Sequence, residues 1–168
     1  MPDPGELLAA ARGLLIAGHP APPTDAQIRR ALSTAYDALF HSVLAAAATR
    51  FMGADAQASA GYAILYRGFQ HSEMKRICEE IDKSFLNRTY RECLKVHAVS
   101  RDMRDFAKGF TDLHVRRHAA DYDPTSKFRA SDVASSIDAA ELAIASFERT
   151  TKQKQADVLA LLLVGARK

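Results

Sequence analysis

Apolar residues recur along this chain at intervals of three and four positions, and this spacing constrains the fold more than any other feature. The clearest run comprises Met103, Phe106, Ala107, Phe110 and Leu113. Such a repeat places its side chains on one face of an α-helix, whereas a half-buried strand would alternate at every second position. No segment of the sequence shows that alternation. The sequence therefore predicts an all-α fold.

Five segments carry the helical pattern and have recognisable ends. They cover residues 6–17, 25–52, 62–81, 101–122 and 131–147. Thr24 and Gln27 have the spacing of a capping box at the start of the second segment. Ser100 is a favourable N-cap for the fourth segment, and Asp123–Pro124 is expected to end it. These signals predict where the main helices begin and end.

Four parts of the chain are less regular. Residues 62–81 predict one long helix or a broken pair, and the last helix either breaks near Thr150 or continues beyond it. The small residues at 53–61 predict a loop, and residues 82–99 predict an irregular excursion. The simplest packing solution is a single domain over residues 1–168, built as a four- to five-helix antiparallel bundle.

The composition fits a globular protein of the cytoplasm. Hydrophobic residues make up 48% and charged residues 26% of the chain, a balance that supports a packed core. The N-terminus lacks the pattern of a secretory signal, and the most apolar stretch, residues 158–164, is too short to cross a bilayer. Cys78 and Cys93 fit two reduced, partly buried thiols. The net charge of +3 permits an acidic partner such as RNA but does not argue for one.

The most informative polar segment is HVRRHAADYDP, residues 114–124. Its candidate site residues are His114, Arg116, Arg117, His118, Asp121 and Tyr122. Arg117 continues the apolar stripe of its helix, and a guanidinium there costs free energy unless it is paired or opens onto a cleft. Two interpretations stay open. Arg117 is a structural tie that caps carbonyls or pairs with an aspartate, or it binds a phosphate at the mouth of a groove.

Weaker candidates lie on the helix expected over residues 25–52. Arg29 and Ser33 share a face with Tyr36, so they should point toward the bundle, whereas His41 lies off that stripe and fits a surface or dimer interface. The sequence contains no Gly-rich phosphate loop, nucleophile elbow or set of metal ligands with known spacing. No metal or cofactor is therefore expected.

Two motifs together resemble those of HEPN domains. STAYDALFH, residues 33–41, is similar to the S-R-A-Y-Y-A-hydrophobic-F-H helix of that family, and RHAADYDP, residues 117–124, is similar to the R-x-x-A-D-Y-D-P signature of its small stand-alone bacterial branch. The resemblance spans roughly residues 25–147 and leaves residues 148–168 as a C-terminal helical extension. It implies a four- or five-helix bundle, frequently dimeric. It also implies a metal-independent RNase, an RNA-binding module, or a toxin-like partner of a minimal nucleotidyltransferase.

In the RNase members of that family an arginine is followed, after four to six residues, by a histidine. The guanidinium stabilises charge on the phosphate and the imidazole moves protons, so that a ribose 2′-hydroxyl attacks the adjacent phosphate. The resemblance carries the first role to Arg117, but Tyr122 stands where the histidine is expected. A phenol has a pKa of about 10 and is a poor general base at neutral pH. Arg117, His118 and Tyr122 are the candidate catalytic residues, and whether they cleave RNA stays open.

Two other function classes fit the same residues. A non-catalytic interaction module would use the apolar surface of the bundle, including residues 158–164, to form a homodimer or bind another protein. A nucleotide-binding bundle would use Arg117 and Arg29 to hold phosphates. The sequence favours an RNA-interacting protein that forms a homodimer, has RNA or a nucleotidyltransferase as its partner, and does not associate with a membrane.

Overall fold

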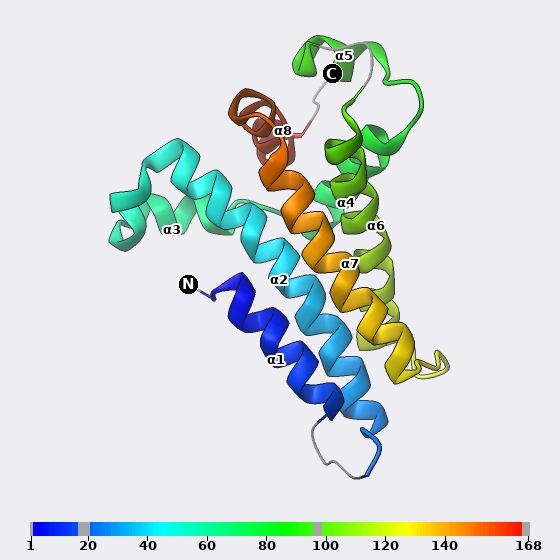
Figure 1. Ribbon diagram of the computed structural model, residues 1–168. Coiled ribbons are helices and arrows are strands. Elements are labelled where there is room, and N and C mark those ends of the chain that lie inside the picture. The colour runs from blue at the N-terminus through cyan, green and yellow to red at the C-terminus, as the bar shows by residue number, and fades with distance from the viewer. Residues whose placement is uncertain (1, 17–20, 96–98, 166–168) are drawn as a thin grey trace. The chain divides into compact units, whose positions relative to one another are not determined.

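The computed structural model describes residues 2–16, 21–95 and 99–165, and every regular element within these ranges is helical (Figure 1). The elements are α1 (Pro4–Ile16), α2 (Asp25–Met52), η1 (Ala54–Ala58), α3 (Ala60–Arg67), α4 (His71–Asp82), α5 (Arg88–Leu94), α6 (Arg101–Tyr122), α7 (Ala130–Arg149) and α8 (Lys152–Val164). The predicted all-α fold is confirmed. The described residues form eight α-helices, more than the four or five that the sequence predicts.

The predicted starts of the two longest helices are confirmed by their hydrogen bonds. At α2 the backbone N–H of Gln27 donates to Thr24 Oγ1 at 3.3 Å, and the backbone N–H of Thr24 donates to Gln27 Oε1 at 2.8 Å. These two bonds complete a capping box. At α6 the backbone N–H of Met103 donates to Ser100 Oγ at 3.3 Å. Helix α6 ends at Tyr122, before Pro124, as expected.

The irregular parts of the chain are more helical than expected. Residues 62–81 belong to a broken pair of helices, α3 and α4, and the predicted loop at 53–61 is wrong, because η1 and the start of α3 occupy most of it. Alanine favours helix, and this stretch is rich in alanine. The predicted excursion contains α5, whose N-cap Asn87 accepts from the backbone N–H of Tyr90 at 3.1 Å. The chain breaks after α7, where Thr151 caps α8.

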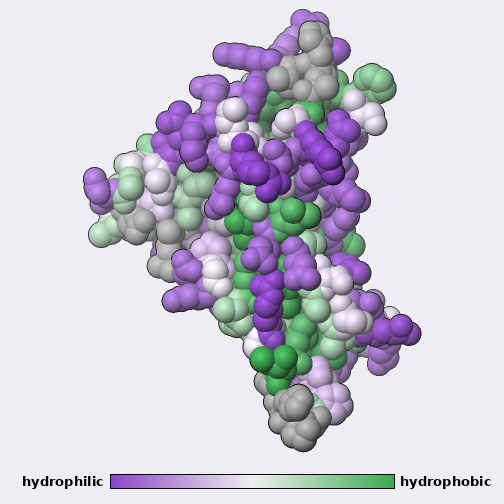
Figure 2. Space-filling view, in the orientation of Figure 1, coloured by the Kyte–Doolittle hydropathy of each residue, from purple (hydrophilic) through white to green (hydrophobic). Residues whose placement is uncertain are grey.

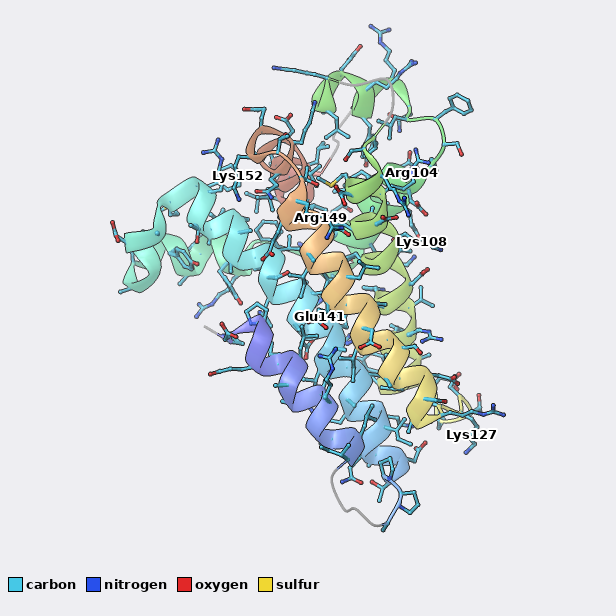
Figure 3. All side chains as sticks on the ribbon, in the orientation of Figure 1. Arg104, Lys108, Lys127, Glu141, Arg149 and Lys152 are labelled. Carbon is cyan, nitrogen blue, oxygen red and sulfur yellow. The ribbon has the colours of Figure 1, made fainter. Side chains whose placement is uncertain are left out.

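The described chain packs as two compact units. The first combines residues 1–42 with residues 109–144, so it contains α1, the first part of α2, the second part of α6 and most of α7. Its core includes Leu32, Tyr36, Phe110, Leu113 and Ile137, all almost fully buried. Arg12 on α1 pairs with Asp138 at 2.9 Å and Glu141 at 2.7 Å on α7. Figure 3 labels Glu141 on α7. In Figure 2 the lower part of the face, which carries α1, shows apolar side chains between polar ones.

The second unit combines residues 43–108 with residues 145–168. Its core includes Met74, Ile77, Ile81, Phe106 and Leu159. Within residues 158–164, Val158, Leu159, Leu161 and Leu162 are buried inside this unit, and Val164 is the strongly exposed member at 58%. Most of this stretch is therefore core and is not the free apolar surface that an interaction module would use. The single-domain organisation stays a prediction.

Two further expectations concern the thiols and the membrane. Cys78 is buried and Cys93 is exposed, so the prediction of two partly buried thiols is wrong for both. Cys78 lies on the apolar face of α4, and Cys93 lies near the end of the short α5. Among the described helices, none is both long enough and apolar enough to span a bilayer.

Candidate functional site

Helices α2 and α6 of the first unit bring several predicted site residues together. The Nε of Arg117 lies 2.7 Å from Asp121 Oδ2, and these two side chains are 25% and 27% exposed. From α2, the hydroxyl of Ser33 donates a hydrogen bond of 2.5 Å to Asp121 Oδ1. Each oxygen of the Asp121 carboxylate therefore has its own partner. The Ser33–Asp121 bond links the two helices, and the ion pair with Asp121 keeps the guanidinium next to this link, although the Nε makes no hydrogen bond of good geometry.

Two aromatic rings lie next to this guanidinium. Its carbon Cζ is 5.9 Å from the ring centroid of Tyr36 and 5.8 Å from that of Tyr122. Tyr36 is fully buried, whereas Tyr122 is 64% exposed. A cation within about 6 Å of a ring centroid is attracted by the negative face of the ring. Arg117 therefore sits between the core of the unit and a ring that faces solvent.

The three predicted histidines occupy different environments. His114 contacts Tyr36 edge-on, with ring centroids 5.7 Å apart, and His118 lies against Tyr122, with centroids 4.9 Å apart. His118 is exposed, whereas His114 is half-buried. His41 is half-buried on α2 and contacts the ring of Phe40. The structure thus places His114 and His118 closest to the rings that contact Arg117.

Asp37 adds a second carboxylate close to Arg117. Burial raises the pKa of Asp37, and the positive charges of His41, Arg117 and Arg30 only partly offset this rise. Burial lowers the pKa of His41, and the charge of Asp37 opposes that shift. Both groups are therefore harder to ionise than in water, because burial disfavours the charged form. Asp121, which is held by Ser33, is the counter-ion directly paired with Arg117.

Arg29 caps backbone carbonyls, which is one of the two roles that the sequence left open for Arg117. Its guanidinium donates to the carbonyl oxygens of Ala120 at 2.9 Å, Asp123 at 3.1 Å and Ser126 at 2.6 Å. Its Nε also pairs with Asp25 at 2.7 Å, and the side chain is only 18% exposed. A positive group at a helix C-terminus neutralises the partial negative charge of the last carbonyls. Arg29 is therefore a structural tie that holds the end of α6.

Arg116 lies on a different face of α6. Its Nη1 donates to the backbone carbonyl of Asp132 at 3.2 Å and to the hydroxyl of Ser136, both on α7. It lines an open groove of about 410 Å³ with residues of α6 and α7. Adjacent positions on a helix point about 100° apart, and Arg116 is held toward α7 by its bonds to Asp132 and Ser136. The structure does not bring Arg116 to the Arg117 cluster.

Sequence reasoning singled out Ser33 and His41 on α2, but it did not assign Ser33 to Asp121 and it missed the bonds of the turn after α6. Ser33, Asp37 and His41 are spaced four residues apart, so they lie one above another on one helix face. That spacing was the available signal. Beyond α6, hydrogen bonds from the Ser126 and Thr125 side chains and from the Thr125 backbone N–H hold the pKa of Asp123 well below its usual range. These bonds fix the turn that follows Tyr122.

Comparison with known proteins gives no relative, because no protein-family model, curated protein or solved structure matches this chain. Within the described ranges, no three His, Cys, Asp or Glu side chains converge as metal ligands. Arg91 and His97 also have the spacing of the RNase motif, outside the segments that resemble the family, and His97 lies outside the described residues. The residues around Arg117 offer guanidinium donors, an exposed aromatic ring and two imidazoles, and they form the candidate site.

Proposed function

We propose that this chain is a HEPN-type protein that binds RNA through Arg117. The observation that supports the proposal is the position of the Arg117 guanidinium, which contacts Asp121 through one nitrogen. Asp121 pairs with its Nε, while no hydrogen bond to another described residue occupies the two terminal amino groups. A guanidinium fixed in this way can offer two parallel N–H groups to the oxygens of a phosphate. The two HEPN-like motifs supply the facing residues, Ser33 from the first and Arg117 with Asp121 from the second.

The surrounding charges set how such binding would behave. Asp121 partly cancels the charge of Arg117, so affinity would depend on directed hydrogen bonds more than on a strong positive field. Arg29 supports the site indirectly, because it neutralises the carbonyl end of α6, which would otherwise repel a phosphate. The expected binding is moderate and weakens as salt concentration rises.

Cleavage is the less supported part of the proposal. Tyr122 replaces the histidine of the RNase pattern, and its phenol is a poor base. If the chain is an endoribonuclease, His118 is the group best placed to take the proton from a 2′-hydroxyl, because it is exposed and lies against Tyr122, the ring that Arg117 contacts. The reaction would need no metal. A toxin-like protein that pairs with a nucleotidyltransferase in the cytoplasm is the biological setting that the resemblance favours.

A second candidate is a non-catalytic interaction module. The observation in its favour is that Ser33, Asp121 and Arg117 form a linked set that stabilises the contact of α2 with α6 without any ligand. On this view the chain acts as a homodimer or binds another protein. A nucleotide-binding bundle has less support, because the guanidinium of Arg29 is already engaged by three carbonyls and Asp25.

The experiment that tests the proposal is a fluorescence-anisotropy titration of 5′-labelled RNA in EDTA. Arg117→Ala should weaken binding about tenfold, the loss expected when one charge-assisted phosphate contact of about 1.5 kcal/mol is removed. Arg101→Ala is the matched control, since this side chain is 94% exposed and its loss changes the net charge equally. Absence of binding by the natural protein, or an equal loss in both variants, would contradict the proposal. Arg117→Ala that lowers only stability would favour the interaction module.

The same samples test cleavage on a denaturing gel. If RNA is cut in EDTA, His118→Ala should abolish cutting, because the imidazole is the group expected to take the proton from the 2′-hydroxyl. Cleavage that persists in this variant would remove His118 from the reaction.

A further inference from the structure

The last residue of α6 is an aromatic side chain in an exposed position. Tyr122 is 64% exposed, although a ring of this size stabilises a protein most when it is buried. Its ring is nevertheless flanked on the protein side. The Cζ of Arg117 lies 5.8 Å from the ring centroid, and the ring of His118 lies 4.9 Å away. The side chain is therefore supported by two neighbours while part of its ring faces solvent.

The backbone around Tyr122 is also fixed. On one side the carbonyl of Ala120 accepts from Arg29, and on the other the carbonyl of Asp123 accepts from the same guanidinium. The backbone N–H of Asp123 donates to the carbonyl of Ala119 at 3.0 Å. A ring on an anchored backbone loses little conformational freedom when a ligand stacks on it.

We propose that the ring of Tyr122, braced by the His118 ring that is tilted 51° against it, is a stacking platform for a nucleobase whose neighbouring phosphate binds Arg117, so that the ligand is single-stranded RNA. This inference rests on the proposed function. The guanidinium lies over one face of the ring, 5.8 Å from its centroid, so a base stacked on the exposed part of the ring would bring its own phosphate close to Arg117. A base inside a duplex has both faces covered by its neighbours, whereas an unpaired base can be displayed on an aromatic ring.

The test compares three labelled ligands in EDTA: an unpaired RNA, an abasic ribose-phosphate strand of the same length, and an RNA duplex. The natural protein should bind the unpaired RNA at least about fivefold more tightly than the abasic strand, the lower end of the effect of one stacked base. Tyr122→Ala should remove this preference, so that both strands bind with equal affinity. Tyr122→Phe should keep the preference, because stacking needs the ring and not the hydroxyl.

Phe85→Ala is the matched control. Phe85 is an exposed aromatic residue at 88%, so its loss removes a similar ring without affecting the site. The control should keep the preference for unpaired RNA. Since Tyr122 is exposed, the helical circular dichroism of Tyr122→Ala should match that of the natural protein.

The possible outcomes separate this inference from the proposed function. Arg117-dependent binding with equal affinity for the unpaired and abasic strands overturns the platform and leaves the RNA proposal standing. Equal or tighter binding of the duplex also overturns the platform. Absence of Arg117-dependent binding to every ligand overturns the proposed function, and the platform with it.

Discussion

Replacing Arg29 by alanine tests how the end of α6 is held. In the first unit its guanidinium donates to three carbonyl oxygens, those of Ala120, Asp123 and Ser126, at 2.9, 3.1 and 2.6 Å. Its Cζ also lies 5.3 Å from the ring centroid of Phe128. With 18% of the side chain exposed, these contacts are only partly screened by solvent. One side chain therefore fixes both the last turn of α6 and the loop that leads to α7.

The expected loss of stability follows from these contacts. A hydrogen bond with one charged partner contributes about 1.5–3 kcal/mol, but the carbonyls regain water in the variant, so we count about 1 kcal/mol for each of the three bonds. The position at the helix C-terminus adds about 0.3–1 kcal/mol, and the contact with the ring adds about 0.5 kcal/mol. Arg29→Ala should therefore lower the free energy of unfolding by about 4 kcal/mol, since these contributions sum to roughly that value.

Urea unfolding followed by circular dichroism measures this loss. Arg29→Lys should retain about half of the stability that alanine loses, because an ammonium group lacks the planar fork that reaches several carbonyls. Asp25→Asn is the control: it removes the ion pair with Arg29, whose aspartate is 60% exposed, and a negative charge in the first turn of α2, and should cost less than about 1 kcal/mol. A value for Arg29→Ala within about 0.5 kcal/mol of the natural protein would refute the reasoning, because this is the range of ordinary surface substitutions.

Three further predictions concern packing, thiol chemistry and pH. A Cβ at position 109 would lie 2.8 Å from the Cβ of Ala143, so Gly109→Ala should lower the free energy of unfolding by about 1–2 kcal/mol. In thermal unfolding, the double variant with Ala143→Gly should lose less stability than the sum of the two single losses. Cys78 is buried and burial raises the pKa of its thiol, whereas Cys93 is exposed. A thiol reagent should therefore label Cys93 quickly and Cys78 only when the protein unfolds. Equal labelling rates would contradict this. Burial lowers the pKa of His41, so the unfolded chain takes up the proton first and stability should fall as the pH drops below about 6.5. His41→Gln should flatten that part of the pH profile, and an unchanged profile would show that another group is responsible.

Helices with strong local signals could be predicted from the sequence, and helices that depend on packing could not. The capping box of Thr24 and Gln27 and the N-cap Ser100 operate through bonds within three residues, so they are visible in the sequence. The short α5 is different, because seven residues are too few to form a stable helix alone. It is supported by burial of Tyr90 and Leu94 in the second unit. Only its N-cap, Asn87, was a local signal.

The candidate site shows the same division. Helical spacing correctly indicated that Arg29 and Arg117 face the interior of the first unit, since both side chains are at most one quarter exposed. It could not assign their partners. Whether an arginine contacts carbonyls or a carboxylate depends on the position of α2 along the axis of α6. That position brings together residues about 90 positions apart in sequence, so local spacing does not reveal it. Asp121 was predicted as a partner of Arg117, whereas the hydroxyl of Ser33 was not assigned to it.

Ultraviolet cross-linking of bound single-stranded RNA, followed by tryptic digestion and mass spectrometry, tests the central claim most directly. Trypsin cleaves after Arg117 and Lys127, so His118 and Tyr122 share one short peptide. The account predicts that the cross-linked nucleotide lies on this peptide, at Tyr122 or His118, and that Arg117→Ala removes the cross-link. A cross-link confined to peptides of α4 or α5, or one that Arg117→Ala leaves unchanged, would contradict it.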